Sequence, residues 1–414
     1  MTDNNENKVL NVPHLRFPKF SGEWEICKVS ELLDFYSTNS LSWEQLEYGE
    51  KAMMNLHYGL IHVGLPTMVD LRRDKLPNVK EGNMPKNFEL CKEGDVAFAD
   101  ASEDTNEVAK VIELFNLDNK DIVCGLHTIH GRDNKNKTIV GFKGYAFSSS
   151  AFHNQIRRIA QGTKIYSIST KNFSECYVGI PSKAEQTKIA TLLRLIDERI
   201  ATQNKIIEKL QSLIKGLNDN IHKGIKGETV CFSDLGEAYS GLSGKGGDDF
   251  GYGEPFITYM NVYQNTYISE KDYELVQIAP NEKQNSVQYG DALFTLSSET
   301  PEEVGIGAVY LGNTQKLYLN SFCFGIHFYD ERVLPQYLAH FISSSSFRRA
   351  IYPLAQGSTR FNLQKNDFMK MKFLLPSLEK QGHIANTLDA LHCRLANEKS
   401  LTEQYILFLN SATL

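Results

Sequence analysis

Few residues in this chain have the types and spacing for chemistry. His127 and His130 could place two imidazoles near each other, a pair that transition metals favour. A packed or surface histidine is the simpler interpretation, because the similar segment His327–Asp330 has only one histidine. Seven cysteines lie far apart without a Cys-x-x-Cys pair, which is typical of scattered reduced thiols. We therefore expect no metal site and no catalytic residue in this chain.

Sequence motifs for phosphate or cofactor chemistry are also missing. None of the 12 prolines follows Asn or Asp, so the Asn-Pro-Pro type motif of base-amine methyltransferases is absent. No GxGxxG or GxxxxGK[ST] spacing occurs. We interpret the run Gly244–Gly247, with Lys245 inside it, as a glycine-rich loop. These absences argue against an enzyme.

Basic residues gather around two Ala-Gln-Gly triplets, 160–162 and 355–357, and in the polar loop 132–137. A solvated surface explains most charge runs, but repetition around both triplets favours contact with nucleic-acid phosphates. The candidate binding residues are Arg132, Lys135, Lys137, Arg157, Arg158, Lys164, Lys245, Arg348, Arg349 and Arg360.

The two triplets belong to an internal repeat. Phe152 matches Phe347 (347 − 152 = 195), and the same offset relates the Ala-Gln-Gly triplets, Gln186 to Gln381, and Ile-Pro 180–181 to Leu-Pro 375–376. Upstream the match loosens: 94–98 resembles 290–294, and 125–127 resembles 325–327. The chain is therefore predicted to be a duplicated structure.

Each half is predicted to contain a mixed globular part followed by a long helix. Strands are expected at 95–99, 292–296 and 322–329, and short helices at 42–60 and 335–345. The predicted boundaries are an N-terminal segment 1–19, a globular domain 20–180, a central helical spacer 181–226, a second globular domain 227–375 and a C-terminal helical spacer 376–414.

The spacers carry apolar residues in alternating steps of four and three, the pattern of a coiled-coil seam. A helix is predicted from Lys183 to His222. Polar Gln203, Glu398 and Thr402 interrupt the seam, either to set its register or because the helices fray or kink there. The predicted seam residues are Ile189, Leu193, Ile196, Ile200, Ile207, Leu210, Ile214, Leu388, Leu391 and Leu395.

The composition limits the class of protein. A length of 414 residues is enough for two or three domains, and the formal net charge of −6 provides no overall basic field. No apolar run reaches the ~18 residues of a membrane span. The first nine residues are polar and acidic, unlike a secretory signal. We expect a cytoplasmic protein with no membrane association.

The sequence resembles the specificity (DNA-recognition) subunit of type I restriction-modification enzymes. The resemblance rests on residues 15–24 (LRFPKFSGEW), the two AQG[ST] loops and the two proline openings into the long helices. It implies an α+β fold in which two α/β target-recognition domains, in tandem pseudo-two-fold repeat, are separated by two helices that form an antiparallel coiled coil. Each domain would read one half of a split site in double-stranded DNA.

The resemblance also implies partners. Such a subunit is not itself an enzyme; it assembles with two methylation subunits and with restriction subunits, so S-adenosylmethionine, ATP and Mg²⁺ are expected there and no cofactor in this chain. Two alternatives compete. A fused methyltransferase-recognition enzyme lacks its catalytic motif here, and a pure coiled-coil scaffold leaves the duplicated globular parts unexplained.

Overall fold

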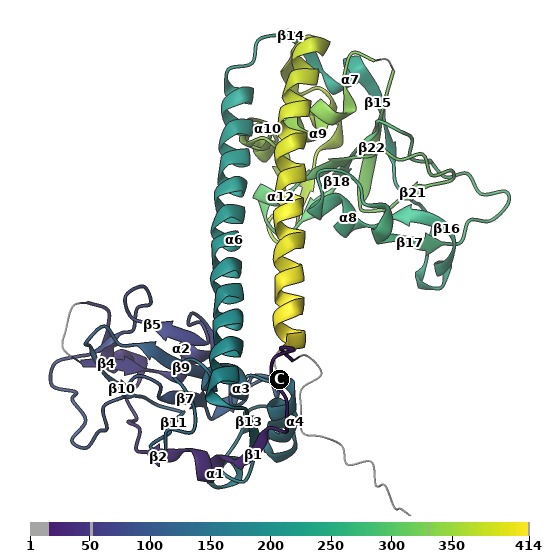
Figure 1. Cartoon of the computed structure of the whole chain (residues 1–414). Coiled ribbons are helices and arrows are strands. Elements are labelled where there is room, and N and C mark those ends of the chain that lie inside the picture. The colour runs from purple at the N-terminus through teal and green to yellow at the C-terminus, as the bar shows by residue number, and fades with distance from the viewer. Residues whose placement is uncertain (1–15, 50–52, 330, 413–414) are drawn as a thin grey trace, which may run out of the picture. The chain divides into compact units, whose positions relative to one another are not determined.

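The computed structural model describes residues 16–49, 53–329 and 331–412, which form two compact units (Figure 1). Unit 1 comprises the chain up to Asn204 together with the segment from Leu401 onward, and unit 2 comprises Lys205–Ser400. Residues 1–15, part of the predicted N-terminal segment, lie outside the described residues. In the described part of the chain, no helix is both long and apolar enough to cross a membrane.

Unit 1 is built on a five-stranded sheet in the order β2-β11-β7-β9-β5 and a four-stranded sheet in the order β10-β4-β6-β3. Two further strand pairs, β1-β13 and β8-β12, complete it. The strands are β1 Glu25–Lys28, β2 Asp34–Tyr36, β3 Leu46–Glu47, β4 Met53–Leu56, β5 Met68–Asp70, β6 Asn78–Val79, β7 Val96–Ala99, β8 Ala101–Ser102, β9 Val111–Asn116, β10 Asp121–Cys124, β11 Thr128–Arg132, β12 Tyr166–Ser167 and β13 Tyr177–Ile180.

Short helices cover these sheets, and one long helix follows them. They are α1 Val29–Leu32, α2 Tyr58–His62, α3 Lys143–Phe147, α4 Ser150–Ile159, α5 Thr170–Phe173 and α6 Lys183–Lys223. The helix predicted over 42–60 is wrong, because the described residues of this stretch, 42–49 and 53–60, form a 3₁₀ turn (Trp43–Gln45), β3, β4 and the start of α2. Parallel pairing of β4 with β10 outweighs the local helical preference.

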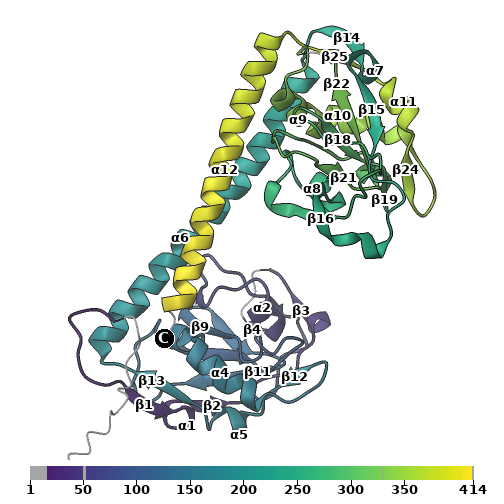
Figure 2. The same ribbon diagram turned by 90° about the vertical axis from the view of Figure 1, so that its right-hand side faces the viewer.

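Unit 2 repeats this plan with a four-stranded sheet in the order β15-β22-β18-β20 (Figure 2). Sheets β17-β16-β21 and β19-β24-β23 and the pair β14-β25 accompany it. Its strands are β14 Glu228–Cys231, β15 Gly236–Ser240, β16 Phe250–Ile257, β17 Tyr273–Val276, β18 Ala292–Thr295, β19 Ser297–Ser298, β20 Gly307–Val309, β21 Tyr318–Leu319, β22 Cys323–Phe328, β23 Ala355–Gln356, β24 Phe361–Leu363 and β25 Lys372–Leu375.

The helices of unit 2 include the one predicted around 335–345, which forms α9 with Pro335 in its first turn. The predicted strands at 95–99, 292–296 and 322–329 are confirmed as β7, β18 and β22. The helices are α7 Phe232–Leu235, α8 Tyr259–Gln264, α9 Pro335–Ser343, α10 Ser345–Ile351, α11 Lys365–Met369 and α12 Leu378–Ala412, and 3₁₀ turns form at Gly247–Asp249, Glu270–Asp272, Pro301–Glu303 and Tyr352–Leu354.

Matching aromatic clusters form the two cores. In unit 1, Phe98, Phe147, Phe152 and Phe173 are fully buried and meet at ring-centroid distances of 4.6–6.5 Å. In unit 2 the cluster consists of Phe232, Phe294, Phe347 and Phe368. Ser149 and Ser344, again 195 residues apart, cap α4 and α10 by accepting a bond from the backbone N–H of Phe152 and Phe347.

The helix predicted from Lys183 to His222 is confirmed as α6, and α6 and α12 lie within the spacer ranges 181–226 and 376–414. In unit 2, Leu217 and Ile221 pack near Ile384 and Leu388, whereas the earlier α6 residues 206–214 pack near the later α12 residues 391–395. Residue numbers rise on one helix as they fall on the other, so the helices run antiparallel in this unit. In unit 1, Leu409 packs on the cluster that contains Ile189 and Leu193.

The predicted seam faces inward along both helices. Six of its ten residues are buried, and Ile196, Ile200, Ile207 and Leu391 are half-buried. Gln203 is fully buried within an uninterrupted α6, so the interpretation that the helix frays there is wrong.

A buried glutamine fixes each long helix to its globular part. Gln186 donates to the carbonyls of Lys137 and Pro181 and accepts from the N–H of Ile139. Gln381 makes the same three bonds with residues exactly one repeat later, namely Arg332, Pro376 and Leu334. Neither side chain is exposed to solvent. The 195-residue offset therefore extends to the contacts that position the helices.

Candidate nucleic-acid interface

The Ala-Gln-Gly triplet in each unit ends in a tight turn that only glycine fits. Gly162 and Gly357 have φ values of 142° and 147°. A Cβ on them would lie 1.9 Å from the carbonyl oxygen of Ile165 and 2.0 Å from that of Arg360. Each turn leads into a strand, β12 or β24, that pairs with β8 or β19. The sequence thus builds the same projecting hairpin in both units.

Four of the predicted cations lie exposed at these hairpins. Arg158 and Arg349 lie on α4 and α10, just before the turns, and Lys164 and Arg360 lie within them. Arg157 is exposed on α4 as well, where Nη1 donates to Oδ1 of Asn106 at 2.9 Å. A cation on an exposed turn can approach a phosphate without losing a partner inside the protein. Their role as phosphate contacts stays a prediction.

Arg132, which is buried, and Arg348, which is half-buried, bond acceptors within the protein instead. Arg132 is 7% exposed, and its Nε and Nη2 bind the Asp95 carboxylate at 2.9 and 2.8 Å, while Nη1 binds Glu89. Arg348 donates to the backbone carbonyls of Glu302, Val304 and Gly305 at 2.7 Å. Both guanidinium groups already donate hydrogen bonds to acceptors in the protein, so neither Arg132 nor Arg348 is a candidate DNA contact.

Three lysines of the prediction also have partners in the protein. Lys245 Nζ lies 2.5 Å from Glu282, whose pKa is lowered to about 2 by bonds from Lys245 and then Gln284. Lys245 is nearly buried, so it too is withdrawn. Lys137 pairs with Glu25 at 2.7 Å, and Lys135 donates to the carbonyl of Glu31. Lys135 is exposed and stays a candidate DNA contact. Lys137 is half-buried and paired with Glu25, so it is the weaker candidate of the two.

A short helix beside each hairpin carries planar side chains. On α2, His62 Nε2 lies 2.9 Å from the carbonyl oxygen of Ala101 in β8. On α8, the Tyr259 hydroxyl donates at 2.8 Å to the carbonyl of Ser297, which begins β19. A glutamate after each strand holds the same helix: Glu107 lies 3.7 Å from His62, and Glu303 accepts from Tyr263 at 2.8 Å. These contacts place the planar side chains of α2 and α8 next to the hairpin of their unit.

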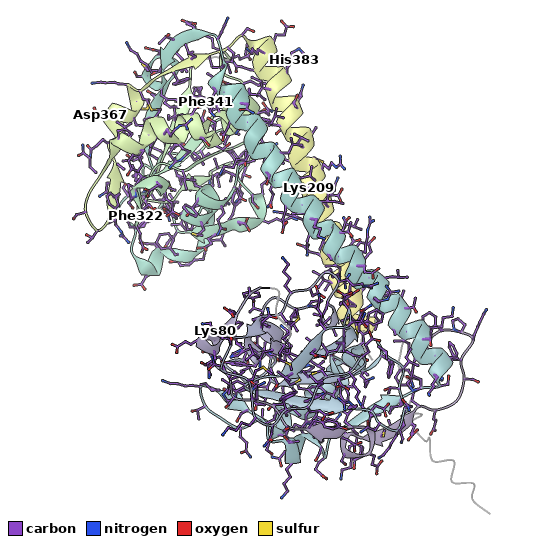
Figure 3. All side chains as sticks on the ribbon, turned by 90° about the vertical axis from the view of Figure 1, so that its left-hand side faces the viewer. Lys80, Lys209, Phe322, Phe341, Asp367 and His383 are labelled. Atoms are coloured by element: carbon purple, nitrogen blue, oxygen red, sulfur yellow. The ribbon has the colours of Figure 1, made fainter. Side chains whose placement is uncertain are left out.

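The pairing of the central strands shows which residue of unit 2 corresponds to His127 of unit 1. Ile129 of β11 is paired with Phe98, and Phe324 of β22 is paired with Phe294, so these strands are related by the 195-residue offset. His127 therefore corresponds to Phe322, and the sequence match of 125–127 with 325–327 is wrong. His127 is exposed in unit 1, and Phe322 is 56% exposed at the surface of unit 2 (Figure 3).

In unit 2 these elements surround a hollow of about 360 Å³. Its lining combines flat or apolar side chains with the Arg360 guanidinium and the Ser298 hydroxyl. Met260 is 47% exposed, so much of this apolar surface faces solvent. Such a surface can contact a base edge or a base face while Arg360 reaches a phosphate. The other lining residues are Tyr259, Tyr263, Ser297, Glu299, Glu303 and Phe322.

In unit 1 the corresponding residues differ. Tyr58 on α2 contacts the rings of His57, His62 and His127 at 4.7–5.9 Å, and Trp43 lies 4.6 Å from His57. Our interpretation of the sequence missed these residues because α2 and α8 are 201 residues apart, outside the 195-residue register. Shifting the alignment to match Tyr58 with Tyr259 would have found them. The units thus present the same surface with different side chains.

The two histidines that the sequence suggested as a possible metal pair, His127 and His130, contact different aspartates. His127 Nδ1 lies 3.1 Å from Asp100, and His130 is 1% exposed inside the sheet, where Nε2 lies 2.7 Å from Asp95. Burial raises the pKa of Asp95, but the bonds from His130 and Arg132 outweigh it and lower the pKa overall. The carboxylate therefore stays charged and holds both side chains.

Comparison with known proteins gives a consistent result. A family model described as "Type I restriction modification DNA specificity domain" matches residues 74–212 and 227–404. The specificity subunit of the type I restriction enzyme EcoKI from Escherichia coli (strain K12) is 25% identical to this chain over 279 residues. The match covers 61% of this chain and 58% of that relative, so the chain spans little more than half the relative's length.

Solved structures show the same fold at low sequence identity. The S subunit of a type I restriction-modification system from M. genitalium has a TM-score of 0.53 and 12% identity, over 97% of each chain. A chain from a structural study of assembly and conformational transition in the type I R-M system has a TM-score of 0.59 and 14% identity, over 97% of this chain and 98% of that one. The predicted α+β architecture of two domains and a long helix pair is confirmed.

Proposed function

The chain belongs to the family of type I restriction modification DNA specificity domains, and we propose that it reads a split target in double-stranded DNA. Each unit carries most of one copy of the matched domain, since the range 74–212 falls mainly in unit 1 and the range 227–404 mainly in unit 2. The chain contributes recognition rather than catalysis. A fused methyltransferase-recognition enzyme is disfavoured by the absence of the methyltransferase motif from the sequence.

The observation that carries this proposal is the repeated surface of hairpin, short helix and planar side chain. The main-chain turn is the same in both units, whereas the side chains of this surface differ: Ile165 in one turn corresponds to Arg360 in the other, and His127 before β11 corresponds to Phe322 before β22. A constant frame suits contact with the regular phosphate backbone, and variable side chains suit base edges. The two half-sites should therefore differ in sequence.

Assembly is part of the proposal. We infer that two methylation subunits bind this chain, one per repeat, because the repeat duplicates the helix anchors as well as the domains. Restriction subunits would join the complex for cleavage. S-adenosylmethionine, ATP and Mg²⁺ would be held by these partners, and the complex would act in the cytoplasm.

The experiment is a substitution in one unit followed by mapping of both half-sites. Phe322→Ala should relax the specificity of the half-site read by unit 2 by ~1–3 kcal/mol at one or two positions and leave the other half-site unchanged. Methylation of a plasmid library by the complex reconstituted with its methylation subunit measures both at once. Lys209→Ala, on the exposed part of α6 (Figure 3), is the matched control. Unchanged specificity at both half-sites would refute this reading surface.

A further inference from the structure

Three side chains from distant parts of the sequence meet in the interior of unit 1. Cys91 precedes β7, Cys124 ends β10 and His130 lies in β11. They are 6%, 2% and 1% exposed. The two Sγ atoms are 3.6 Å apart, and a ring nitrogen of His130 lies within 4.8 Å of both. Thiolate and imidazole are the ligands that zinc prefers in proteins.

The two nitrogens of His130 have unequal surroundings. Nε2 lies 2.7 Å from the Asp95 carboxylate, which fixes this nitrogen as the donor. Nδ1 is buried and has no hydrogen-bond partner among the described residues. Its lone pair is therefore available inside the protein. A histidine whose other nitrogen donates to a carboxylate is the usual arrangement of a metal ligand.

Unit 2 shows that the fold does not require this cluster. Cys91 N–H bonds the carbonyl of Ile122, and Val287 N–H makes the equivalent bond to Leu317. Cys124 is paired with Leu56 as Leu319 is paired with Ile257. Val287 and Leu319 thus replace the cysteines, and both are buried.

The position of His130 is also replaced in unit 2. Gly325 stands there, and a Cβ on it would lie 2.2 Å from Cζ of Tyr239. The Tyr239 hydroxyl donates to Asp291 at 2.7 Å, as His130 Nε2 does to Asp95. A tyrosine hydroxyl can therefore replace the histidine as the hydrogen-bond donor to this aspartate. Unlike His130, a tyrosine has no second ring nitrogen that could bind a metal. Among the residues that the structure describes, only unit 1 combines two thiols with an imidazole.

We propose that unit 1 binds one Zn²⁺ through Sγ of Cys91, Sγ of Cys124 and Nδ1 of His130, with Asp95 orienting the imidazole. Two sulfurs bound at ~2.3 Å in a tetrahedron lie about 3.8 Å apart, close to the separation seen here. A disulfide would need ~2.05 Å. On binding, each thiol releases its proton to solvent and the imidazole stays neutral. Water completes the tetrahedron. The ion links the segment before β7 to β10 and β11.

The test is the metal content of the tag-free full chain, purified without chelator. Mass spectrometry of the metals should find about one zinc per chain. The double variant Cys91→Val/Cys124→Leu, which installs the residues of unit 2, should lose it, and His130→Gln should bind it more weakly. Cys393→Ser removes an exposed thiol outside the cluster and should retain full content. Cobalt added to the zinc-free chain should give a thiolate-to-cobalt charge-transfer band that the double variant lacks.

Stability gives a second measurement. Chelation should lower the Tm of the wild-type chain, zinc should restore it, and the double variant should respond to neither. A wild-type chain with no more zinc than the double variant, or a mass two hydrogens below the reduced value that shows a Cys91–Cys124 disulfide, would overturn the site. Copper in place of zinc would overturn the choice of ion.

Discussion

At the scale of single residues, neighbouring arginines in α10 have opposite environments. Arg348 is directed inward, where it bonds the three carbonyls of residues 302, 304 and 305, and burial lowers its pKa. Arg349, one position later, is exposed. Because consecutive helical residues point about 100° apart, one side chain can stabilise the fold while the next faces solvent.

We predict that Arg348→Ala destabilises the chain, whereas Arg349→Ala weakens DNA binding. Loss of three carbonyl partners should lower the free energy of unfolding by about 2 kcal/mol. Arg349→Ala should change stability by less than ~0.5 kcal/mol and reduce the slope of log K against log salt by about 1. Urea unfolding and binding titrations at several salt concentrations measure the two effects. The same loss of stability in both variants would contradict this division.

At the scale of elements, the buried glutamines couple each long helix to its domain. The fully buried Gln381 side chain satisfies one backbone N–H and two backbone carbonyls. Seam packing alone leaves a helix free to rotate or slide by a turn. The three bonds of Gln381 fix α12 relative to β25 and α9, and those of Gln186 do the same for α6.

We predict that Gln381→Ala lowers the free energy of unfolding by about 3 kcal/mol, because three backbone groups lose the buried amide that bonds them. Gln186→Ala should have an effect of the same size, since its bonds are the same. Lys380→Ala, an exposed neighbour, should change stability by less than ~0.5 kcal/mol. Thermal and urea unfolding of the four chains compare them, and a small effect at both glutamines would show that the seam holds the helices without them.

The sequence predicts an element well when the pattern that specifies it lies within one segment, and poorly when the element depends on a distant strand. The seam and the proline openings lie within single segments, so periodicity reveals α6 almost to the residue and places α12 within the predicted spacer 376–414. Residues 53–56 form the strand β4 rather than a helix because β4 pairs with β10, some 70 residues later. The partner of a strand is not written in its own periodicity, and for this reason the 42–60 prediction fails.

At the scale of the whole molecule, α6 and α12 pass through the division between the units, at Asn204–Lys205 and Ser400–Leu401. If these helices set the distance between the two half-sites, a lengthened pair should lengthen the DNA spacer. The connection after α6, residues 224–227, is unsuitable for this change. Asn218 and Asp219 near the end of α6 already bind the globular part of unit 2, through the carbonyl of His340 and through Ser345.

We predict that seven residues inserted at both divisions lengthen the spacer by about 3 base pairs. A heptad preserves the seam, and 1.5 Å per residue gives ~10 Å against ~3.4 Å per base pair. The half-site sequences should stay the same. Methylation mapping on plasmids with variable spacers measures both properties, with a seven-residue insertion in the loop 224–227 as the control. An unchanged spacer in the doubly lengthened chain would show that the helices do not set this distance.

By itself, the sequence determined the duplicated plan: two globular parts, two long helices and a loop at each Ala-Gln-Gly triplet. These features repeat along the chain or recur within one segment, so spacing alone reveals them. Only the tertiary structure decided which cations remain free, because Arg132, Lys245 and Arg348 find acceptors 37 to 46 residues away. It also brought Cys91 and Cys124 beside His130. Contacts between distant segments depend on strand pairing and burial, which residue types and spacing do not specify.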